Sequence, residues 1–393
     1  MRILFYAHSS TMYGANTSLI NLISGLKLRD SSLELHLIIP SHSDLIHILK
    51  KENIDYTIIT HYNWIYDNDL YSSKLRNNKI IGRIWKYKNI LQKYLLNKRQ
   101  LKEHKSFVRN FDPDLIYVNS SLAPMGLMVA NALSIPYLWH HRETLNDPLT
   151  SYYLEDLTRF KYYYKNAKIH IFPSHFLAIY YSALFNDRDT EKIVVPNGVA
   201  FLSDKNLKQI QTSENISFGI VGRINKQKGQ QEVIECFERI YAEKGTNSNL
   251  PELHLIGGGV KEYIDELKEN LTSKSIFFSG FVNSPETFSC IDYLIINAKN
   301  ESFGRVVAEA NALGIPVIAL KSGALPELIQ ENINGFLYRD SSELTEIIEK
   351  LSFQHDKDYY RNLTLSSRKT FENRFSIEKY SEIILDVIKK LKN

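Results

Sequence analysis

The sequence predicts an α/β protein with two domains, each built on a parallel β-sheet covered by helices. The chain has 393 residues, more than one hydrophobic core usually organises. Short apolar runs alternate with stretches of helical period along both halves. A polar stretch without an apolar period, residues 203–215, separates the two series. We therefore expect one domain over residues 1–202 and a second over residues 203–375.

The first domain opens with an apolar run at residues 3–7, a loop, and a helical pattern from Leu19 to Leu26 whose apolar residues recur at spacings of three and four. Further strands are expected at residues 33–39, 114–119, 135–140, 168–172 and 192–196. The intervening stretches can form helices, so the strands are expected to run parallel.

The second domain repeats this alternation. Strands are expected at residues 216–222, 252–259, 275–280, 292–298 and 315–320. Helices are expected at residues 229–243, 259–271 and 304–313. Each half thus has the pattern of a Rossmann-like domain. Residues 376–392 have the period of an amphipathic helix, whose apolar face must be buried against another element.

The composition is that of a folded protein with little overall charge bias. Apolar residues make up 44%, charged residues 23%, and the net charge is +4. No apolar run reaches the ~18 residues that span a bilayer, and the first ten residues are too polar for a signal peptide. Cys236 and Cys290 lack metal-ligand spacing and suggest core thiols in helix-like surroundings. These features predict a cytoplasmic protein, which can still rest on the inner face of the plasma membrane.

The stretch NESFGRVVAEANALGIPVIALKSG, residues 300–323, suggests a ligand site. Glu301 follows a strand, whereas Glu309 lies within the next helix. A helix that starts near Gly304 would direct the amides of Arg305 and Val306 at a phosphate, with the glutamates accepting hydrogen bonds from sugar or ribose hydroxyls. The alternative is a surface helix with two solvated glutamates.

The second motif is a basic loop, GRINKQKGQ at residues 222–230, which also follows a predicted strand. It places Arg223 and Lys228 at the start of a helix, where two cations and oriented amides can hold a diphosphate. A solvated surface loop is the alternative.

These motifs together resemble a known family. The segments GRINKQKG, LIGGG, the run from GFVNSPETF to ALPELI, and NGFLY resemble, in this order, the donor-binding half of glycosyltransferase family 4, retaining enzymes with the GT-B fold. The similarity covers most of residues 216–340. In the first half, SSTMYGANTSLINLISGL, WHHRE, FPSHF and VVPNGV fit the same pattern less closely. The resemblance implies two Rossmann-like domains that face each other across a cleft, with the C-terminal helix, residues 376–393, crossing back onto the first domain.

The resemblance also implies roles for individual residues. Arg223 and Lys228 would bind the diphosphate and Glu309 the ribose, while Glu301 would contact the transferred sugar. His140 would lie near the reacting sugar, although His141 is adjacent and leaves the register open. The expected catalytic residues are therefore His140, Arg223, Lys228 and Glu301. The expected nucleotide-sugar contacts are Gly14, in the loop beneath the phosphates, Val282, near the base, Ser302, Phe303, Gly304, Arg305, Val306 and Glu309. Tyr13 and Ser322 stand where the family commonly has a second glycine.

The chemistry expected from these residues needs no metal or other cofactor. No Asp-x-Asp pair lies beside the donor motif, so cations and helix amides would neutralise the leaving diphosphate. No carboxylate of the first half stands out as a nucleophile. The sequence therefore favours same-face attack, in which the departing phosphate takes the acceptor proton. The donor base, UDP or GDP, is left open.

Residues 72–105 suggest a partner surface. This stretch holds eleven lysines and arginines against one glutamate, interleaved with Ile, Leu, Tyr and Trp. Such a pattern suits an anionic membrane and predicts a glycan or polyprenyl-linked glycan as acceptor, as in bacterial O-antigen or capsule synthesis. A solvated helix packed on the first domain explains the pattern equally well.

Other functions fit parts of the sequence. A sugar-nucleotide epimerase or a phosphorylase would share the two-domain architecture, and a non-catalytic glycan-binding protein could keep the fold. A nucleotide-dependent oxidoreductase lacks support, because only Gly14 stands where a G-x-G-x-x-G motif would follow the first strand. Nucleic-acid binding is the weakest alternative, since no recognition motif accompanies the basic stretch.

Overall fold

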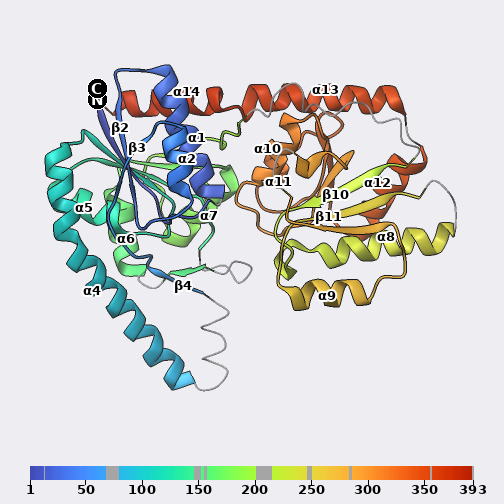
Figure 1. Cartoon of the computed structure of the whole chain (residues 1–393), viewed down its shortest axis with the longest axis horizontal. Helices are drawn as coiled ribbons and strands as arrows, with labels where there is room; N and C mark the ends of the chain where they lie inside the picture. Colours follow the sequence, from blue (N-terminus) through green and yellow to red (C-terminus); the bar gives the residue numbers. More distant parts are fainter. Residues whose placement is uncertain are drawn as a thin grey trace. The chain divides into compact units, whose positions relative to one another are not determined.

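The chain forms two compact units in a computed structural model that describes residues 1–12, 14–67, 79–145, 152–154, 157–200, 215–245, 250–282, 286–354 and 356–391 (Figure 1). Unit 1 comprises Met1–Gly198 together with Ile377–Asn393, and unit 2 is Val199–Ser376. The chain thus leaves unit 1 four residues before the predicted boundary, and it returns for its last helix.

Unit 1 is built on a seven-stranded parallel sheet with the order β3-β2-β1-β5-β6-β8-β9. Its strands are β1 (Arg2–Tyr6), β2 (Glu34–Ile39), β3 (Asp55–Ile58), β5 (Leu115–Asn119), β6 (Tyr137–His140), β8 (Ile169–Phe172) and β9 (Lys192–Val194). A separate antiparallel ribbon pairs β4 (Ile65–Asp67) with β7 (Tyr152–Leu154).

Helices cover both faces of this sheet. They are α1 (Gly14–Arg29), α2 (Leu45–Lys51), α4 (Lys79–Phe111), α5 (Met125–Leu133), α6 (Leu157–Asn166), α7 (His175–Phe185) and α14 (Ile377–Lys390). Because side chains alternate along a strand, Ile3 and Phe5 pack with α1 and α14, whereas Leu4 and Tyr6 pack with α5, α6 and α7 on the other face. A Cβ on Gly25 of α1 would lie 2.8 Å from Ile377 and Ser381, so this glycine permits the close approach of α14.

Unit 2 has a six-stranded parallel sheet with the order β12-β11-β10-β13-β14-β15. Its strands are β10 (Ser217–Val221), β11 (Glu252–Ile256), β12 (Ile276–Gly280), β13 (Tyr293–Ile296), β14 (Val317–Leu320) and β15 (Gly335–Tyr338). Its helices are α8 (Gln230–Lys244), α9 (Lys261–Glu269), α10 (Arg305–Ala312), α11 (Leu325–Leu328), α12 (Ser341–Phe353) and α13 (Lys357–Arg374), with short 3-10 turns η2 (Lys226–Lys228) and η3 (Glu286–Phe288).

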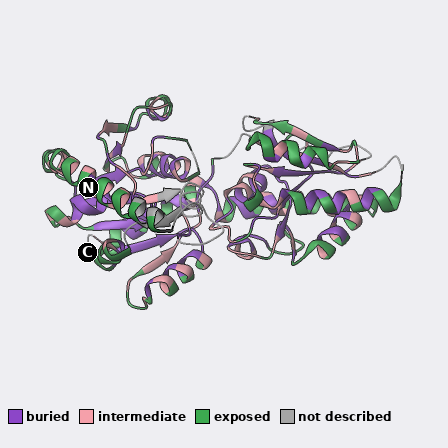
Figure 2. Ribbon diagram, turned by 90° about the horizontal axis from the view of Figure 1, so that it is seen from below, coloured by how far each residue is buried: buried purple, intermediate pink, exposed green. Residues whose placement is uncertain are grey.

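Both sheets are buried between helices, as Figure 2 shows by the purple strands and the green outer faces of the helices. In each sheet the chain reverses the direction in which strands are added, between β1 and β5 in unit 1 and between β10 and β13 in unit 2. Loops that leave such neighbouring strands diverge, and ligands of doubly wound sheets bind in the crevice this creates. The predicted α/β class with two parallel sheets is confirmed.

Several details differ from the prediction. The strands β3 and β15 were missed, because four-residue runs such as DYTI and GFLY carry little periodicity. Gly14 is the first residue of α1 and does not lie in the preceding loop. Cys236 is buried in α8 as expected, whereas Cys290 is half-buried in a turn after η3, outside any helix. Within the described part of the chain, no helix combines the length and the apolar character that crossing a membrane would require.

Candidate active site

The predicted donor residues gather at the switch point of the unit 2 sheet. The loop after β10 carries Arg223 and Lys228, and the loop after the neighbouring strand β13 carries Glu301. The Lys228 Nζ donates to Glu301 Oε2 at 2.7 Å, with both side chains partly exposed. The structure therefore brings together two of the four predicted catalytic residues.

The backbone holds Lys228 in place through a tight turn. Asn225 caps η2, its side chain accepting from the Lys228 amide at 3.1 Å. Gly229 follows with φ +65, and a Cβ there would lie 2.5 Å from the Asn297 side chain and 2.8 Å from its carbonyl oxygen. Only glycine combines this left-handed conformation with so close an approach.

Asn297 links the two loops, and the sequence analysis did not identify it. Its Nδ2 donates to the Gly229 carbonyl at 2.9 Å and to Glu232 Oε2 at 2.7 Å, while its Oδ1 accepts from the Tyr338 hydroxyl at 2.9 Å. Asn297 is buried at the end of β13, and Tyr338 ends the NGFLY segment. A polar residue directly after a buried strand was the signal that could have indicated it.

The loop after β14 also holds the Glu301 backbone in place. A Cβ on Gly323, which has φ +59, would lie 2.6 Å from the Glu301 amide nitrogen and carbonyl oxygen. The Ala324 amide donates to that carbonyl at 2.8 Å. Ser322, which replaces an expected glycine, accepts from the Asn300 amide at 3.2 Å through its hydroxyl. Ser322 therefore supports this loop instead of disturbing it.

The start of α10 follows Glu301 by four residues. Gly304 has φ +80 and ends the loop, so the amides of Arg305 and Val306 lie in the first turn of α10. Glu309, one turn later, accepts from Arg305 Nε at 2.7 Å. Ser302 is half-buried, whereas Phe303 is buried in the core beneath α10.

Two further predicted residues, Arg223 and Val282, lie on the loops after β10 and β12. Arg223 is exposed, and its carbonyl accepts from Gln230 Nε2 at 3.0 Å. Val282 is half-buried against the core, and its carbonyl accepts from the Thr287 hydroxyl at 3.0 Å. Among the contacts of the described residues, none joins Arg223 or Val282 to Glu301.

The edge of the unit 1 sheet carries the two candidate histidines, which face opposite sides. His141 uses both ring nitrogens in the core, with Ser121 Oγ at 2.7 Å and His170 Nδ1 at 2.9 Å. His140 has its Nδ1 2.5 Å from the Tyr117 hydroxyl, while its buried Nε2 has no hydrogen-bond partner among the residues that the structure describes. Burial holds the pKa of both rings well below the usual histidine value, and both are neutral at pH 7.

Arg142 forms a buried network that the sequence analysis missed. Its Nε donates to Asn119 Oδ1 at 3.0 Å, and its terminal nitrogens donate to Asn197 Oδ1 and, at 3.0 Å, to the Tyr380 hydroxyl. Asn119 ends β5, Asn197 lies in VVPNGV, and Tyr380 belongs to α14. One guanidinium thus connects the strand edge with the segments where the chain leaves and re-enters unit 1.

Glu143 is a half-buried carboxylate at this edge, and the sequence did not single it out. Burial raises its pKa, and hydrogen bonds from the Ser120 hydroxyl at 2.9 Å and the Ser121 amide at 3.3 Å oppose that shift. Gly14, the remaining candidate of unit 1, is exposed at the start of α1.

Two parallel sheets, one with a lysine and glutamates at its switch point, define a doubly wound α/β protein. Residues 203–370 match the family described as glycosyl transferases group 1. Similarity to glycosyltransferases, predicted from the motifs, is thereby confirmed.

Individual relatives point to the same class. The chain is 29% identical over 191 residues to N-acetyl-alpha-D-glucosaminyl L-malate synthase of Bacillus anthracis, covering 47% of this chain and 49% of that protein. It is 29% identical over 188 residues to the capsular polysaccharide biosynthesis glycosyltransferase CapM of Staphylococcus aureus, covering 46% and 47%. The chain thus spans about half the length of these relatives.

The fold extends to solved structures over the whole chain. The crystal structure of HepE from Anabaena in complex with UDP superposes with a TM-score of 0.74 at 18% identity, covering 99% of this chain and 100% of that one. The architecture is that of the GT-B glycosyltransferases.

Proposed function

We propose that the protein is a retaining glycosyltransferase of the family 4 type that transfers a sugar from a UDP- or GDP-sugar to a glycan acceptor. The observation that carries this proposal is the Lys228–Glu301 pair at the switch point of unit 2, in which Glu301 lies four residues before the start of α10. A cation and helix amides suit a diphosphate, while carboxylates suit sugar hydroxyls.

Donor binding would proceed by exchange of partners. In the structure Lys228 and Arg305 are each paired with a glutamate at 2.7 Å. A diphosphate takes over the ammonium of Lys228, which frees Glu301 to accept from the sugar and leaves Glu309 for the ribose. Arg223, exposed on the same loop, adds charge to the phosphates. In this mechanism these groups, rather than a metal ion, stabilise the departing diphosphate.

Transfer would occur on one face of the sugar. The bond between the anomeric carbon and the diphosphate oxygen breaks, the acceptor oxygen bonds to the same face, and the acceptor proton passes to a departing phosphate oxygen. Glu301 orients the sugar. His140 is our choice over His141 for the sugar-side histidine, because His141 uses both ring nitrogens in the core.

The relatives support the proposed substrates. HepE was crystallised with UDP, and CapM is named for capsular polysaccharide biosynthesis. We extend this to a lipid-linked glycan acceptor at an anionic membrane because of α4. The predicted basic stretch begins at residue 72, and its first seven residues lie outside the described ones.

Helix α4 has one packed face and one exposed face. Asn97, His104 and Val108 are buried against unit 1. The opposite side exposes a stripe of large apolar residues at spacings of three and four, namely Ile80, Ile84, Tyr87, Leu91 and Leu95. The helix holds ten lysines and arginines and one glutamate. One face of this helix thus packs on the first domain, and the exposed face suits an anionic membrane surface, which supports this part of the proposal.

A two-part experiment tests the proposal. Thermal unfolding is followed with UDP, GDP and their sugars, and the true donor raises the midpoint because it binds only the folded state. Release of the nucleoside diphosphate is then measured with and without a glycan acceptor. Release that depends on the acceptor supports transfer, whereas conversion of the sugar nucleotide alone indicates an epimerase. Binding of glycan without any turnover indicates a non-catalytic protein.

A further inference from the structure

Glu143 places a carboxylate at the switch point of the unit 1 sheet. It follows β6 by three residues, and its two carboxylate oxygens accept from the Ser120 hydroxyl at 2.9 Å and from the Ser121 amide at 3.3 Å. These serines follow β5, which borders β1 where the direction of strand addition reverses. Ligands of doubly wound sheets bind at this place, so Glu143 lies where a ligand of unit 1 is expected.

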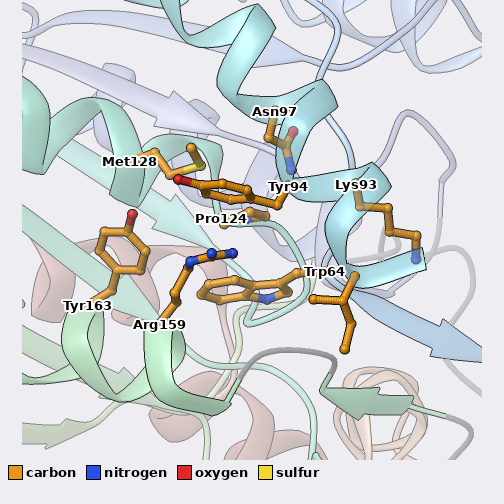
Figure 3. Close-up of a pocket in the computed structure, with 9 residues that line it drawn as sticks. Trp64, Lys93, Tyr94, Asn97, Pro124, Met128, Arg159 and Tyr163 are labelled. Atoms are coloured by element: carbon orange, nitrogen blue, oxygen red, sulfur yellow. The ribbon is translucent and has the colours of Figure 1, made fainter. Parts of the chain in front are cut away.

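The loop that holds this carboxylate is fixed by two tryptophans. The Trp139 indole N–H donates to the Ser120 carbonyl at 3.1 Å, and the Trp64 indole N–H donates to the Ser121 carbonyl at 2.8 Å. Figure 3 shows Trp64 where it packs with Pro124 of the same loop around a small hollow. Ser120 is buried with φ +82, a left-handed conformation that is uncommon for a serine. Backbone strain of this kind persists where the surroundings hold it, and it clusters at ligand sites.

Glu143 keeps hydrogen-bonding capacity for a ligand. A carboxylate has about four lone-pair sites, and the bonds from Ser120 and Ser121 use two of them. The side chain is half-buried, and no ion pair joins it to any residue that the structure describes. Burial raises its pKa, which shows that its charge is poorly compensated. A half-buried carboxylate without a cationic partner, at the ligand-binding edge of a sheet, is a candidate for contact with a substrate.

Arg142, the neighbour of Glu143 in the chain, is committed to the protein. Each of its three side-chain nitrogens donates to a protein group, and the acceptors are Asn119, Asn197 and Tyr380. An acidic group of a ligand beside Glu143 would therefore meet a like charge, while every nitrogen of this guanidinium is already in use. Like charges repel, whereas a neutral hydroxyl can donate to the carboxylate.

A second polar group at this edge also suits a neutral ligand. His8 follows β1 by two residues, and its buried Nδ1 has no hydrogen-bond partner within the described part of the chain. Burial, Arg142 and His61 lower its pKa to about 4, so the ring is neutral at pH 7 and can donate or accept according to its tautomer. Arg142 acts on the pKa of both His8 and Glu143, so both lie near this guanidinium. A neutral ring and a carboxylate match the hydroxyls of a sugar, which both donate and accept.

We infer that Glu143 is an acceptor-binding carboxylate of unit 1, which accepts a hydrogen bond from a hydroxyl of a neutral sugar and excludes a sugar that carries an acid group there. The inference rests on the proposed function, since it names the class of the acceptor. Glu143 orients the hydroxyl and takes no proton from it, because the departing phosphate receives the acceptor proton. A brace for the loop of Ser120 and Ser121 is the competing role, and a brace would not select between neutral and acidic acceptors.

Binding of matched glycosides to the full-length protein tests the inference. The probes are the methyl glycosides of glucose, galactose and mannose, each compared with its uronic acid counterpart, and NMR titration gives the affinities. We expect at least one neutral glycoside to bind about tenfold more tightly than its acid counterpart, the factor for one hydrogen bond to a charged group. Equal binding of the two forms, tighter binding of the acid, or no binding of any neutral glycoside overturns the inference.

Variants assign the selectivity to the charge of Glu143. Glu143→Gln keeps the shape of the side chain, and it should weaken the neutral glycoside about tenfold and abolish most of its advantage over the acid. Ser120→Ala keeps the charge but removes one hydrogen bond that holds it, so the affinity should fall while the preference for the neutral form remains. Asp187→Asn is the matched control, because Asp187 is a half-buried carboxylate of unit 1 paired with Lys192 at 2.7 Å, and it should leave both affinities unchanged. A preference that persists in Glu143→Gln, or an unchanged affinity in Ser120→Ala, overturns the inference.

Transfer assays separate this inference from the proposed function. Glu143→Gln should raise the KM for a neutral acceptor about tenfold and leave the thermal shift with the donor nucleotide unchanged, whereas loss of a brace would lower kcat for every acceptor alike. No transfer to any acceptor, with neutral glycosides still bound through Glu143, would remove the proposed function and leave the sugar site. Transfer that Glu143→Gln leaves unchanged for neutral and acidic acceptors would keep the proposed function and remove this inference.

Discussion

The carboxyl edges of the two sheets hold their polar residues in opposite ways. In unit 2, Lys228 and Glu301 are partly exposed and paired with each other. In unit 1, His141 and Arg142 are buried, and every hydrogen bond of theirs described above ends on another protein group. The first edge carries charges that can change partners, whereas the second is a fixed framework.

This difference follows from the cost of burial. A partly exposed ion pair contributes about 1 kcal/mol or less, so an anionic ligand displaces it at little cost. A buried guanidinium or imidazole must keep its partners, because a buried polar group that loses its hydrogen bond costs about 1–3 kcal/mol. Unit 2 is therefore suited to binding and release, and unit 1 to fixed geometry.

Lowering the pH should have the largest effect, and it should destabilise unit 1 more than unit 2. Burial lowers the pKa of His104 and of His170 to about 3, against 6.5 for an exposed histidine. Above pH 6.5 both histidines are neutral in the folded and in the unfolded chain. Between pH 6.5 and 3 they are protonated only in the unfolded chain, so the free energy of unfolding falls as the pH drops toward 3. In that range each of these histidines lowers the free energy of unfolding by about 1.4 kcal/mol per pH unit. Glu143 acts in the opposite direction, because its pKa is raised.

Tryptophan fluorescence can isolate this effect, because Trp64, Trp85 and Trp139 all lie in unit 1. Urea unfolding is compared at pH 7.5 and at pH 5. The urea midpoint measured by fluorescence should fall strongly at pH 5, whereas the midpoint of the part of the circular dichroism signal that arises from unit 2 should fall less. His104→Gln should reduce the pH dependence of the stability of unit 1 by the equivalent of about one proton. Equal losses of stability in both units would contradict the proposed difference between the buried polar residues of unit 1 and the partly exposed ones of unit 2.

Lys228→Ala should have the next largest effect. Removal of one cation from the leaving diphosphate should lower kcat by about 10²–10³, the range found when one donor to a developing negative charge is deleted. Lys226→Ala is the matched control, since Lys226 lies on the same turn and is exposed. It should retain nearly full activity, and a comparable loss in both variants would show that the loop, rather than the ammonium of Lys228, was affected.

The sequence predicted the charged edge far better than the buried one. Glu301 and Gly304 were singled out because one motif holds them three residues apart along the chain, and Lys228 because it lies in a second motif, a basic loop that directly follows a strand. Arg142 was missed because its partners Asn119 and Tyr380 lie 23 and 238 positions away. A network of that kind exists only after the sheet has formed and α14 has returned. The strand order was equally beyond prediction, since alternation fixes the parallel class but not which strands are neighbours.

Arg142→Leu should destabilise unit 1 by about 3 kcal/mol, because it leaves the acceptors Asn119 and Asn197 and the Tyr380 hydroxyl without their partner. The fluorescence midpoint in urea measures this loss. Arg29→Leu is the comparison, since Arg29 bonds Ser381 of the same helix α14 but is partly exposed, and it should cost less than about 1 kcal/mol. Similar costs for the two variants would contradict a buried framework around Arg142.

The smallest effect tests how firmly the backbone beneath Lys228 is held. Gly229 precedes α8 with φ +65 and ψ +27, so alanine there should cost about 1–2 kcal/mol of left-handed strain. A Cβ at 229 would also lie 2.5 Å from the Asn297 side chain. Gly229→Ala should therefore lose about 1 kcal/mol beyond that strain in urea unfolding and also weaken nucleotide binding. A loss no larger than the strain alone would mean that the turn shifts freely, so the exchange of partners proposed for Lys228 would involve the backbone as well as the side chain.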